Sequence, residues 1–166
     1  MGRDKSLVRW QGVPMVLRAV LVLDASGCAP VRVVGGDAVA LAELGLVAVP
    51  DQWPGEGPLG GVITALRAFP GRRVMVIACD LPELSPPTVA AVIAALGGDH
   101  DVAYAVTDRP HPLCAVWSPG ALPAIEASFA AGIRRMGDLI ATLRAREVSV
   151  PPQDVRNVNA PSDLPQ

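Results

Sequence analysis

The chain has 166 residues, of which 51% are apolar and 18% charged, and its formal net charge is −2. This composition excludes a disordered tail, and the charge gives no reason to expect nucleic acid or an anionic membrane as a partner. No apolar run approaches the roughly 18 residues of a membrane span, and the first residues are too polar for a signal peptide. We therefore expect one globular domain over residues 1–166, long enough to bury a core without staples.

Short β-branched runs, which predict strands, alternate with longer Ala/Leu-rich stretches, which predict helices. In chain order we expect a helix over 15–25, a strand over 31–34, a helix over 38–44, a strand over 46–49, a helix over 59–69, a strand over 74–78, a helix over 87–96, strands over 102–106 and 115–117, helices over 121–131 and 135–144, and a strand over 147–150. Such alternation is typical of crossover units, so we predict an α/β fold with a mostly parallel sheet covered on both faces.

The start of the chain lacks the strand and glycine-rich turn with which a domain of this kind normally opens. Its first residues, MGRDK, are already polar, and a helix-like stretch follows soon after. We expect the missing strand to belong in the middle of the sheet, where its absence leaves backbone groups unpaired.

The three cysteines are Cys28, Cys79 and Cys114. Their odd number and the absence of C-x-x-C spacing argue against a disulfide framework or a zinc site. We expect reduced thiols and a cytoplasmic protein.

An acidic residue follows the strand expected over 74–78. Asp80 comes directly after this run, and Pro82 then prevents the strand from continuing. Ligands of open α/β sheets bind outside the carboxyl ends of the strands, and Mg²⁺ needs only one or two protein oxygens there. Asp80 is a candidate metal ligand, and a cap of the following turn is an equally supported alternative.

A loop rich in glycine and proline leads from the strand expected over 46–49 to the next helix. It contains Asp51 and reads PDQWPGEGPLGG from residue 50. Glycines such as Gly57 and Gly61 allow close approach of backbone to a ligand, and N–H groups at a helix start favour an anion or a base edge. No Gly-Lys-Ser/Thr follows, which excludes a Walker loop. On these residues alone an ordinary loop is favoured over a nucleotide-binding one.

Further candidates lie near the two ends of the chain and in its second half. Lys5 precedes the first helix and either neutralises a triphosphate or belongs to a solvated terminus. Asn157 and Asn159 flank one apolar residue and either contact a phosphate or pterin or form an Asx-turn. Arg134 and Arg135 precede a helix and either bind an acceptor phosphate or form a solvated helix start.

Taken in chain order, these segments resemble one family. The segments are MGRDK, PDQWPGEGPLGG, ACDLP, HPLCAVW and RNVNAPSDL, and they are similar to the molybdenum cofactor guanylyltransferases, within the wider nucleotidyltransferase superfamily. The resemblance runs from Met1 to about Pro165. Each segment is a weak signal by itself, whereas all of them in this order are fairly specific.

The resemblance implies a Rossmann-like three-layer fold and transfer of GMP from GTP to molybdopterin, with release of pyrophosphate. It implies that Lys5 contacts the nucleotide phosphates, that Asp51 is an acid of the loop that reads guanine and ribose, and that Asp80 binds Mg²⁺. Asn157 and Asn159 match the asparagine pair near the cofactor. With Gly57 and Gly61 on the nucleotide and Arg134 on the acceptor, these residues form the expected site.

The chain departs from the family pattern at two places. The family opens with a strand and a Leu-Ala-Gly-Gly-x-x-x-Arg turn that wraps the phosphates, and Met1 here aligns with an internal methionine. We therefore expect an N-terminally incomplete domain, through a start-codon error or a trimmed chain. Gly35 stands where some members carry an asparagine near the nucleotide.

Two other functions stay open at this point. One is a cytidylyltransferase or another NTP transferase of the same fold, because the GPLGG segment favours guanine only weakly. The other is a non-catalytic homologue that binds the cofactor or a partner, because the phosphate turn is absent.

For the enzyme we expect in-line attack on the α-phosphorus without a protein nucleophile, with Mg²⁺ on Asp80 and the charge of Lys5 stabilising the phosphates. The expected partners are GTP, molybdopterin, and cofactor-handling proteins or molybdoenzymes.

Overall fold

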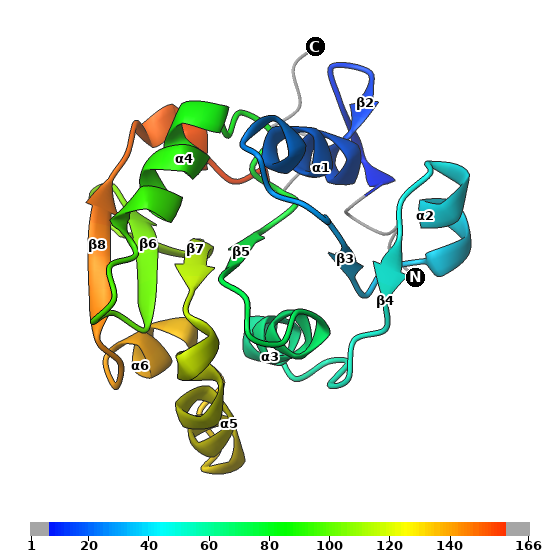
Figure 1. Cartoon of the computed structure of the whole chain (residues 1–166). Helices are drawn as coiled ribbons and strands as arrows, with labels where there is room; N and C mark the ends of the chain where they lie inside the picture. The colour runs from blue at the N-terminus through cyan, green and yellow to red at the C-terminus, as the bar shows by residue number, and fades with distance from the viewer. Residues whose placement is uncertain (1–6, 159–166) are drawn as a thin grey trace.

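The structure is a computed structural model, and it describes residues 7–158 of the chain. A central four-stranded sheet has the order β5-β7-β6-β8. Its strands are β5 (Val74–Ile77), β6 (Val102–Val106), β7 (Pro110–Trp117) and β8 (Ala145–Ser149). Helices cover both faces of this sheet (Figure 1), which confirms the three-layer α/β architecture.

The central sheet is mixed. Strand β7 pairs antiparallel with both β5 and β6, whereas β6 and β8 are parallel. Strands β5, β6 and β8 therefore share one direction, as expected for a mostly parallel sheet, and β7 is the exception. The reason is the short connection over residues 107–109, because a crossover to a parallel strand needs a dozen or more residues.

Two further strands lie beside the central sheet. Strand β3 (Val33–Val34) pairs in parallel with β4 (Ala48–Val49), and α2 (Ala38–Glu43) connects them. Both strands are shorter than the runs at 31–34 and 46–49 predicted. In the part of the chain that the structure describes, β3 and β5 are not hydrogen-bonded to each other. Within residues 7–158, the pair β3–β4 and the four-stranded sheet are therefore separate sheets.

Apolar side chains from the helices form a core on each face of the central sheet. Helix α1 (Met15–Ala25) and α4 (Pro86–Ala95) pack on one face, and α3 (Pro58–Ala68), α5 (Leu122–Ala130) and α6 (Met136–Ile140) pack on the other. Helix α1 has the predicted bounds. Ser85 caps α4 by accepting a hydrogen bond from the Thr88 N–H, and two prolines follow it in the first turn of the helix. Among residues 7–158, no helix is long and apolar enough to cross a membrane.

Some predicted elements differ from the structure. The helix predicted over 135–144 ends at Ile140, because Arg144 leaves the helical path and its N–H and guanidinium bind Asp101. A short hairpin of β1 (Arg9–Trp10) and β2 (Val13–Pro14) was not predicted. Its turn residues Gln11 and Gly12 both have positive φ, at 48° and 79°, which is the backbone geometry of tight two-residue hairpins.

Two short 3₁₀ turns lie in the second half of the described chain. One, η2 (Pro119–Ala121), precedes α5, and the other, η3 (Pro152–Val155), follows β8. The second turn leads into Asn157 and therefore positions one of the candidate residues.

Candidate active site

Asp80 and Asn157 lie side by side just beyond the carboxyl end of β5. The Asn157 side chain donates from Nδ2 to Asp80 Oδ1 at 3.1 Å. The N–H of Val158 donates to the backbone carbonyl of Asp80 at 3.0 Å. The structure thus brings together the expected metal ligand and one of the expected acceptor-binding asparagines.

A second set of contacts holds the Asn157 segment against the start of α4. Asp154 is only 6% exposed, and its Oδ2 accepts hydrogen bonds from the Ser85 hydroxyl and, at 2.6 Å, from Thr88 Oγ1. Arg156 forms an ion pair with Glu83. These contacts fix the backbone that precedes Asn157 relative to the start of α4. The sequence reading missed Asp154, because its partners lie far away in the chain.

Asp51 stabilises the loop between β4 and α3 through hydrogen bonds of its side chain. Its Oδ1 accepts hydrogen bonds from the Trp53 N–H at 3.0 Å and from Thr64 Oγ1 at 3.3 Å. The first of these closes an Asx-turn. A Cβ on Gly35 would lie 3.7 Å from Asp51 Cβ, so the end of β3 is close to this loop.

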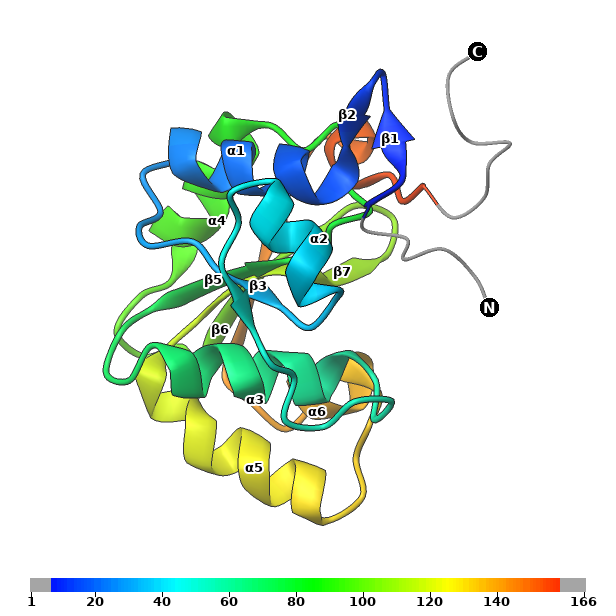
Figure 2. The ribbon, with the colours of Figure 1, turned by 90° about the vertical axis from the view of Figure 1, so that its right-hand side faces the viewer.

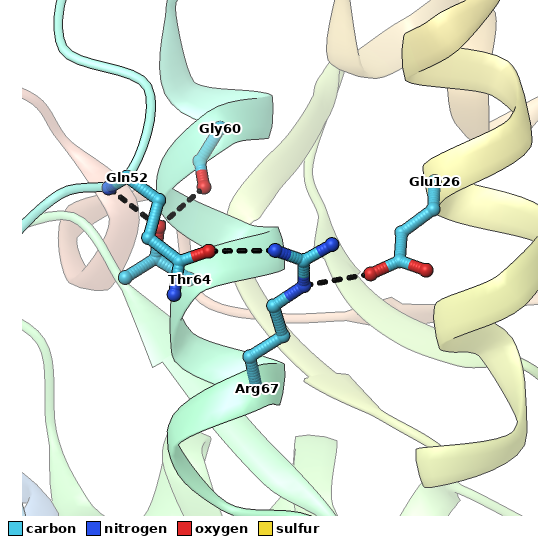
Figure 3. A network of polar contacts seen from close by, with 5 residues as sticks. All are labelled: Gln52, Gly60, Thr64, Arg67 and Glu126. Carbon is cyan, nitrogen blue, oxygen red and sulfur yellow. Dashed lines mark hydrogen bonds and ion pairs between the residues drawn. The ribbon is translucent and has the colours of Figure 1, made fainter.

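A polar network ties the same loop to helices α3 and α5 (Figure 3). Arg67 donates to Gln52 Oε1 at 2.7 Å and to Glu126 Oε1 at 2.8 Å. The Gln52 N–H donates to Thr64 Oγ1 at 3.2 Å, and that hydroxyl donates to the Gly60 carbonyl at 3.0 Å. The loop is therefore anchored by hydrogen bonds to α3, and through Arg67 to α5.

Trp53 packs tightly on the first turn of α3. A Cβ on Gly60 would lie 2.9 Å from Trp53 Cβ, so this contact requires glycine. The indole of Trp53 meets Phe129 edge-on at 5.5 Å between ring centroids, and the Arg67 guanidinium lies over the indole. These contacts give Trp53 a packing role and identify Gly60 as the glycine on which the loop position depends.

Gly57 and Arg134 meet at the start of α3. Gly57 has φ 82°, a conformation that favours glycine, and the Arg134 carbonyl lies about 4.0 Å from where its Cβ would be. The Arg134 side chain pairs with Glu56 at 2.6 Å, donates to the Phe129 carbonyl and stacks on the Phe129 ring. Arg134 is thus bound to the loop before α3, and its hydrogen bonds do not join it to Asn157 within the described part of the chain.

The two groups of residues lie along one side of the molecule. Figure 2 shows the loop before α3, the hairpin β1–β2 and the segment after η3 on the side where β5 ends. This is the edge at which α/β sheets bind their ligands. Gly61, in the first turn of α3, has open space around its Cβ position.

A surface pocket of about 500 Å³ is lined on one side by the ion pair of Arg156 with Glu83. Its lining comes from the β6–β7 turn, from Glu83 and from the η3 segment, and includes Thr107, Asp108, Arg109, His111, Gln153 and Arg156. His111 is 9% exposed, and its Nε2 lies 2.9 Å from Thr107 Oγ1. Burial, with a smaller contribution from Arg109, lowers the pKa of His111. The imidazole therefore belongs to the wall of the pocket as a neutral group.

The donor atoms around Asp80 suit a magnesium ion bound mainly through phosphates. Among residues 7–158, no group of three or more His, Cys, Asp and Glu side chains could enclose a metal ion. A single carboxylate at a strand end, beside an amide side chain, supplies the hard oxygen that Mg²⁺ takes from proteins. The residues present fit Mg²⁺ and do not form a structural zinc site there.

Burial disfavours the thiolate form of two of the three cysteines. Cys28, Cys79 and Cys114 form no disulfide among the described residues. Burial raises the pKa of Cys114 to about 12, and burial together with Asp24 raises the pKa of Cys28. Raised pKa values disfavour the reactive thiolate at Cys28 and Cys114.

Two predicted site residues, Lys5 and Asn159, lie outside the described residues. Their predicted roles stay predictions.

Comparison with known proteins places this geometry in a family. The family model for the MobA-like NTP transferase domain matches residues 1–148. The molybdenum cofactor guanylyltransferase of Rhodobacter capsulatus is 36% identical over 99% of this chain and 86% of its own length. A probable molybdenum cofactor guanylyltransferase of Pelotomaculum thermopropionicum is 33% identical over 99% of this chain and 83% of its own length.

Solved structures agree on the fold. Molybdopterin-guanine dinucleotide biosynthesis protein A from Archaeoglobus fulgidus superposes with a TM-score of 0.76 at 22% identity, over 98% of this chain and 87% of that chain. A 2-C-methyl-D-erythritol 4-phosphate cytidylyltransferase from Thermus thermophilus superposes with a TM-score of 0.74 at 17% identity, over 96% of this chain and 89% of that chain. The family match and the two curated relatives show that the chain belongs to the MobA-like NTP transferase family. This family includes the molybdenum cofactor guanylyltransferases, which are nucleotidyltransferases.

Proposed function

We propose that this chain transfers GMP from GTP to molybdopterin and releases pyrophosphate, with Asp80 holding Mg²⁺ against the nucleotide phosphates. The contact that carries the proposal is the hydrogen bond from Asn157 to Asp80 at the carboxyl end of β5. It puts an acceptor-binding candidate within reach of a metal-binding candidate. The reaction needs this proximity, because the acceptor phosphate attacks the phosphorus whose oxygens the metal would neutralise.

Asp80 and Asn157 have different roles at the reacting phosphates in this proposal. Mg²⁺, when bound, supplies charge neutralisation on the α-phosphate and the leaving pyrophosphate. The Asn157 amide orients the Asp80 carboxylate by donating to one of its oxygens, as outer-shell partners of metal ligands do. Lys5 adds positive charge on the leaving pyrophosphate in this proposal, and Asn159 contacts the acceptor.

The loop between β4 and α3 is the proposed guanine site. Asp51 folds the loop through its Asx-turn, and Gly57 and Gly61 leave its backbone open to a base edge. The loop is held by the Arg67 network and by the ion pair of Arg134 with Glu56. Arg134 therefore supports the nucleotide loop in this proposal, and its expected contact with the acceptor is not part of it.

The pocket lined by Glu83 and Arg156, the residue before Asn157, is the proposed acceptor site. Arg109 and Arg156 in its wall offer bidentate donors to a phosphate, and Asp108 and Glu83 offer acceptors to the amide edge of a pterin. Molybdopterin carries both kinds of group. We expect the reaction to occur in the cytoplasm, where the three thiols stay reduced.

The test is a pyrophosphate-release assay with molybdopterin, Mg²⁺ and either GTP or CTP. We expect release with GTP, and Asp80→Asn lowers the rate by about 10²–10³. Asp138→Asn, an exposed carboxylate on α6, is the matched control and leaves the rate unchanged. Equal rates for Asp80→Asn and the parent chain would contradict the metal role. Faster release with CTP would favour the cytidylyl alternative, and nucleotide binding without release would favour the non-catalytic one.

A further inference from the structure

An arginine occupies a position of α1 at which the helical pattern predicts an apolar residue. Met15 and Val22 are buried, and spacings of three and then four residues place Arg18 on the same face of the helix. This face packs on the segment before α4, because Val22 belongs to one apolar cluster with Leu81 and Leu84. Figures 1 and 2 show α1 next to α4. Arg18 is half-buried at this contact.

The Arg18 guanidinium is bound to a backbone carbonyl. Its Nε donates to the Pro82 oxygen at 3.0 Å, although the two residues are 64 positions apart in the chain. Among residues 7–158, no acidic side chain forms an ion pair with Arg18. An arginine of a solvated helix face points into water, whereas this one brings its charge to the segment that follows Asp80.

Pro82 belongs to a tight turn that begins directly after Asp80. The Leu84 N–H donates to the Leu81 carbonyl at 3.3 Å, which closes a β-turn with proline at its second position, where such turns favour it. Glu83 is the third residue of this turn. The Pro82 carbonyl takes no part in the bond that closes the turn, and Arg18 supplies its hydrogen bond.

Two further contacts hold the same stretch of backbone from another element. The Val158 N–H donates to the Asp80 carbonyl at 3.0 Å, and Arg156 pairs with Glu83. Both of these donors come from the segment after η3, whereas Arg18 comes from α1. The turn therefore connects the candidate metal ligand to the wall of the candidate acceptor pocket, and Arg18 binds it at its middle.

We propose that Arg18 is a positioning residue for the transfer reaction. It holds the turn that sets Asp80 for Mg²⁺ at one end and the Glu83–Arg156 pair for the acceptor at the other. This rests on the proposed function, because it takes Asp80 as the metal ligand. Arg18 acts through the backbone, so removal of its donor leaves the Pro82 carbonyl without this partner. We then expect the turn to open more often.

The first measurement is amide hydrogen exchange of the chain without nucleotide. Arg18→Met keeps the apolar stem and removes the guanidinium, and Arg146→Met, at an exposed position of β8, is the matched control. We expect the Leu84 amide to exchange about fivefold faster in Arg18→Met and at the parent rate in the control. The Val89 amide, bound to the Ser85 carbonyl in α4, reports on the fold and stays unchanged. An unchanged Leu84 rate, or equal acceleration at Val89, would overturn the proposal.

The second measurement is GMP transfer at several Mg²⁺ concentrations. We expect Arg18→Met to require about tenfold more Mg²⁺ for its half-maximal rate, which is the scale of effect that supporting partners of metal ligands have. Arg18→Lys, which keeps a charged donor, recovers most of this loss. An unchanged Mg²⁺ dependence would refute the positioning role. With a raised KM for GTP it would make Arg18 a direct ligand contact, and without one it would make Arg18 a residue of the fold alone.

Asp80→Asn, measured in parallel, separates this proposal from the proposed function. Transfer at the parent rate by Asp80→Asn refutes the metal role, whatever the exchange at Leu84 shows. Impaired Asp80→Asn, together with parent-like Leu84 exchange and Mg²⁺ dependence in Arg18→Met, refutes the role of Arg18 alone. Should Arg18→Met fail to fold, Arg18→Gln, which is shorter and uncharged, replaces it in both measurements and carries the same expectations.

Discussion

The side-chain amide of Asn157 donates to Asp80 Oδ1 at 3.1 Å, although the two residues are 77 positions apart in the chain. Asp80 follows the end of β5, and Asn157 follows the end of η3. We expect Asn157→Ala to lower GMP transfer by about tenfold to a hundredfold, the usual effect of removing an outer-shell partner of a metal ligand. The loss is expected to shrink at high Mg²⁺ concentration if the amide acts through the metal. A rate equal to that of the parent chain would contradict this role.

Asp154 is predicted to stabilise the fold as well as the site. Asp154→Ala removes the shared acceptor of Ser85 and Thr88, and leaving buried polar groups without partners costs about 1–3 kcal/mol. Urea denaturation measures this loss as a lower midpoint. Ser85→Ala leaves the Thr88 contact in place and is expected to cost less, so a larger loss for Ser85→Ala would contradict the assignment.

Gly60 is predicted to be intolerant of a side chain. In Gly60→Ala the new Cβ meets Trp53 at 2.9 Å, and such overpacking costs about 1–3 kcal/mol. The displaced loop is also expected to raise the KM for GTP. Gly61→Ala is the control for stability, because nothing lies within 4 Å of its Cβ position. Equal unfolding midpoints for the two alanine variants would show that Trp53 moves aside freely.

His111 is predicted to make stability depend on pH. Because burial lowers the pKa of His111 below its ordinary 6.5 in the folded state, the unfolded chain binds the proton more readily. Stability is therefore full above about pH 6.5 and falls as the pH drops from there toward the folded-state pKa. His111→Gln removes this dependence. Urea midpoints at about pH 7.5 and 5.5 are expected to differ more for the parent chain than for the variant, and equal differences would contradict the explanation.

The sequence predicted the elements that depend on local patterns. The bounds of α1 follow from its apolar stretch, and the Ser85 cap follows from serine before two prolines. Asp80 could be singled out because a strand-like run ends just before it and Pro82 stops the strand. The family resemblance, carried by segments in a fixed order, is confirmed by the match over residues 1–148.

Long-range partners could not be predicted in the same way. Asp154 contacts Ser85, and Arg67 contacts Gln52 and Glu126. These contacts depend on how segments distant in the chain pack together, and the local spacing of residues does not indicate that. Arg134 illustrates the limit, since a pair of arginines before a helix suggested an anion site, whereas its side chain pairs with Glu56. The reversed direction of β7 had a local signal, the short connection at 107–109, which the alternation of strands and helices obscured.

The most direct measurement of the central claim is a crystal structure of the chain bound to a non-hydrolysable GTP analogue and Mn²⁺, which gives an anomalous signal. The account predicts an anomalous peak that touches both an Asp80 carboxylate oxygen, at roughly 2.1 Å, and the nucleotide phosphates. Nucleotide bound with the peak away from Asp80, or with no peak at all, would contradict it.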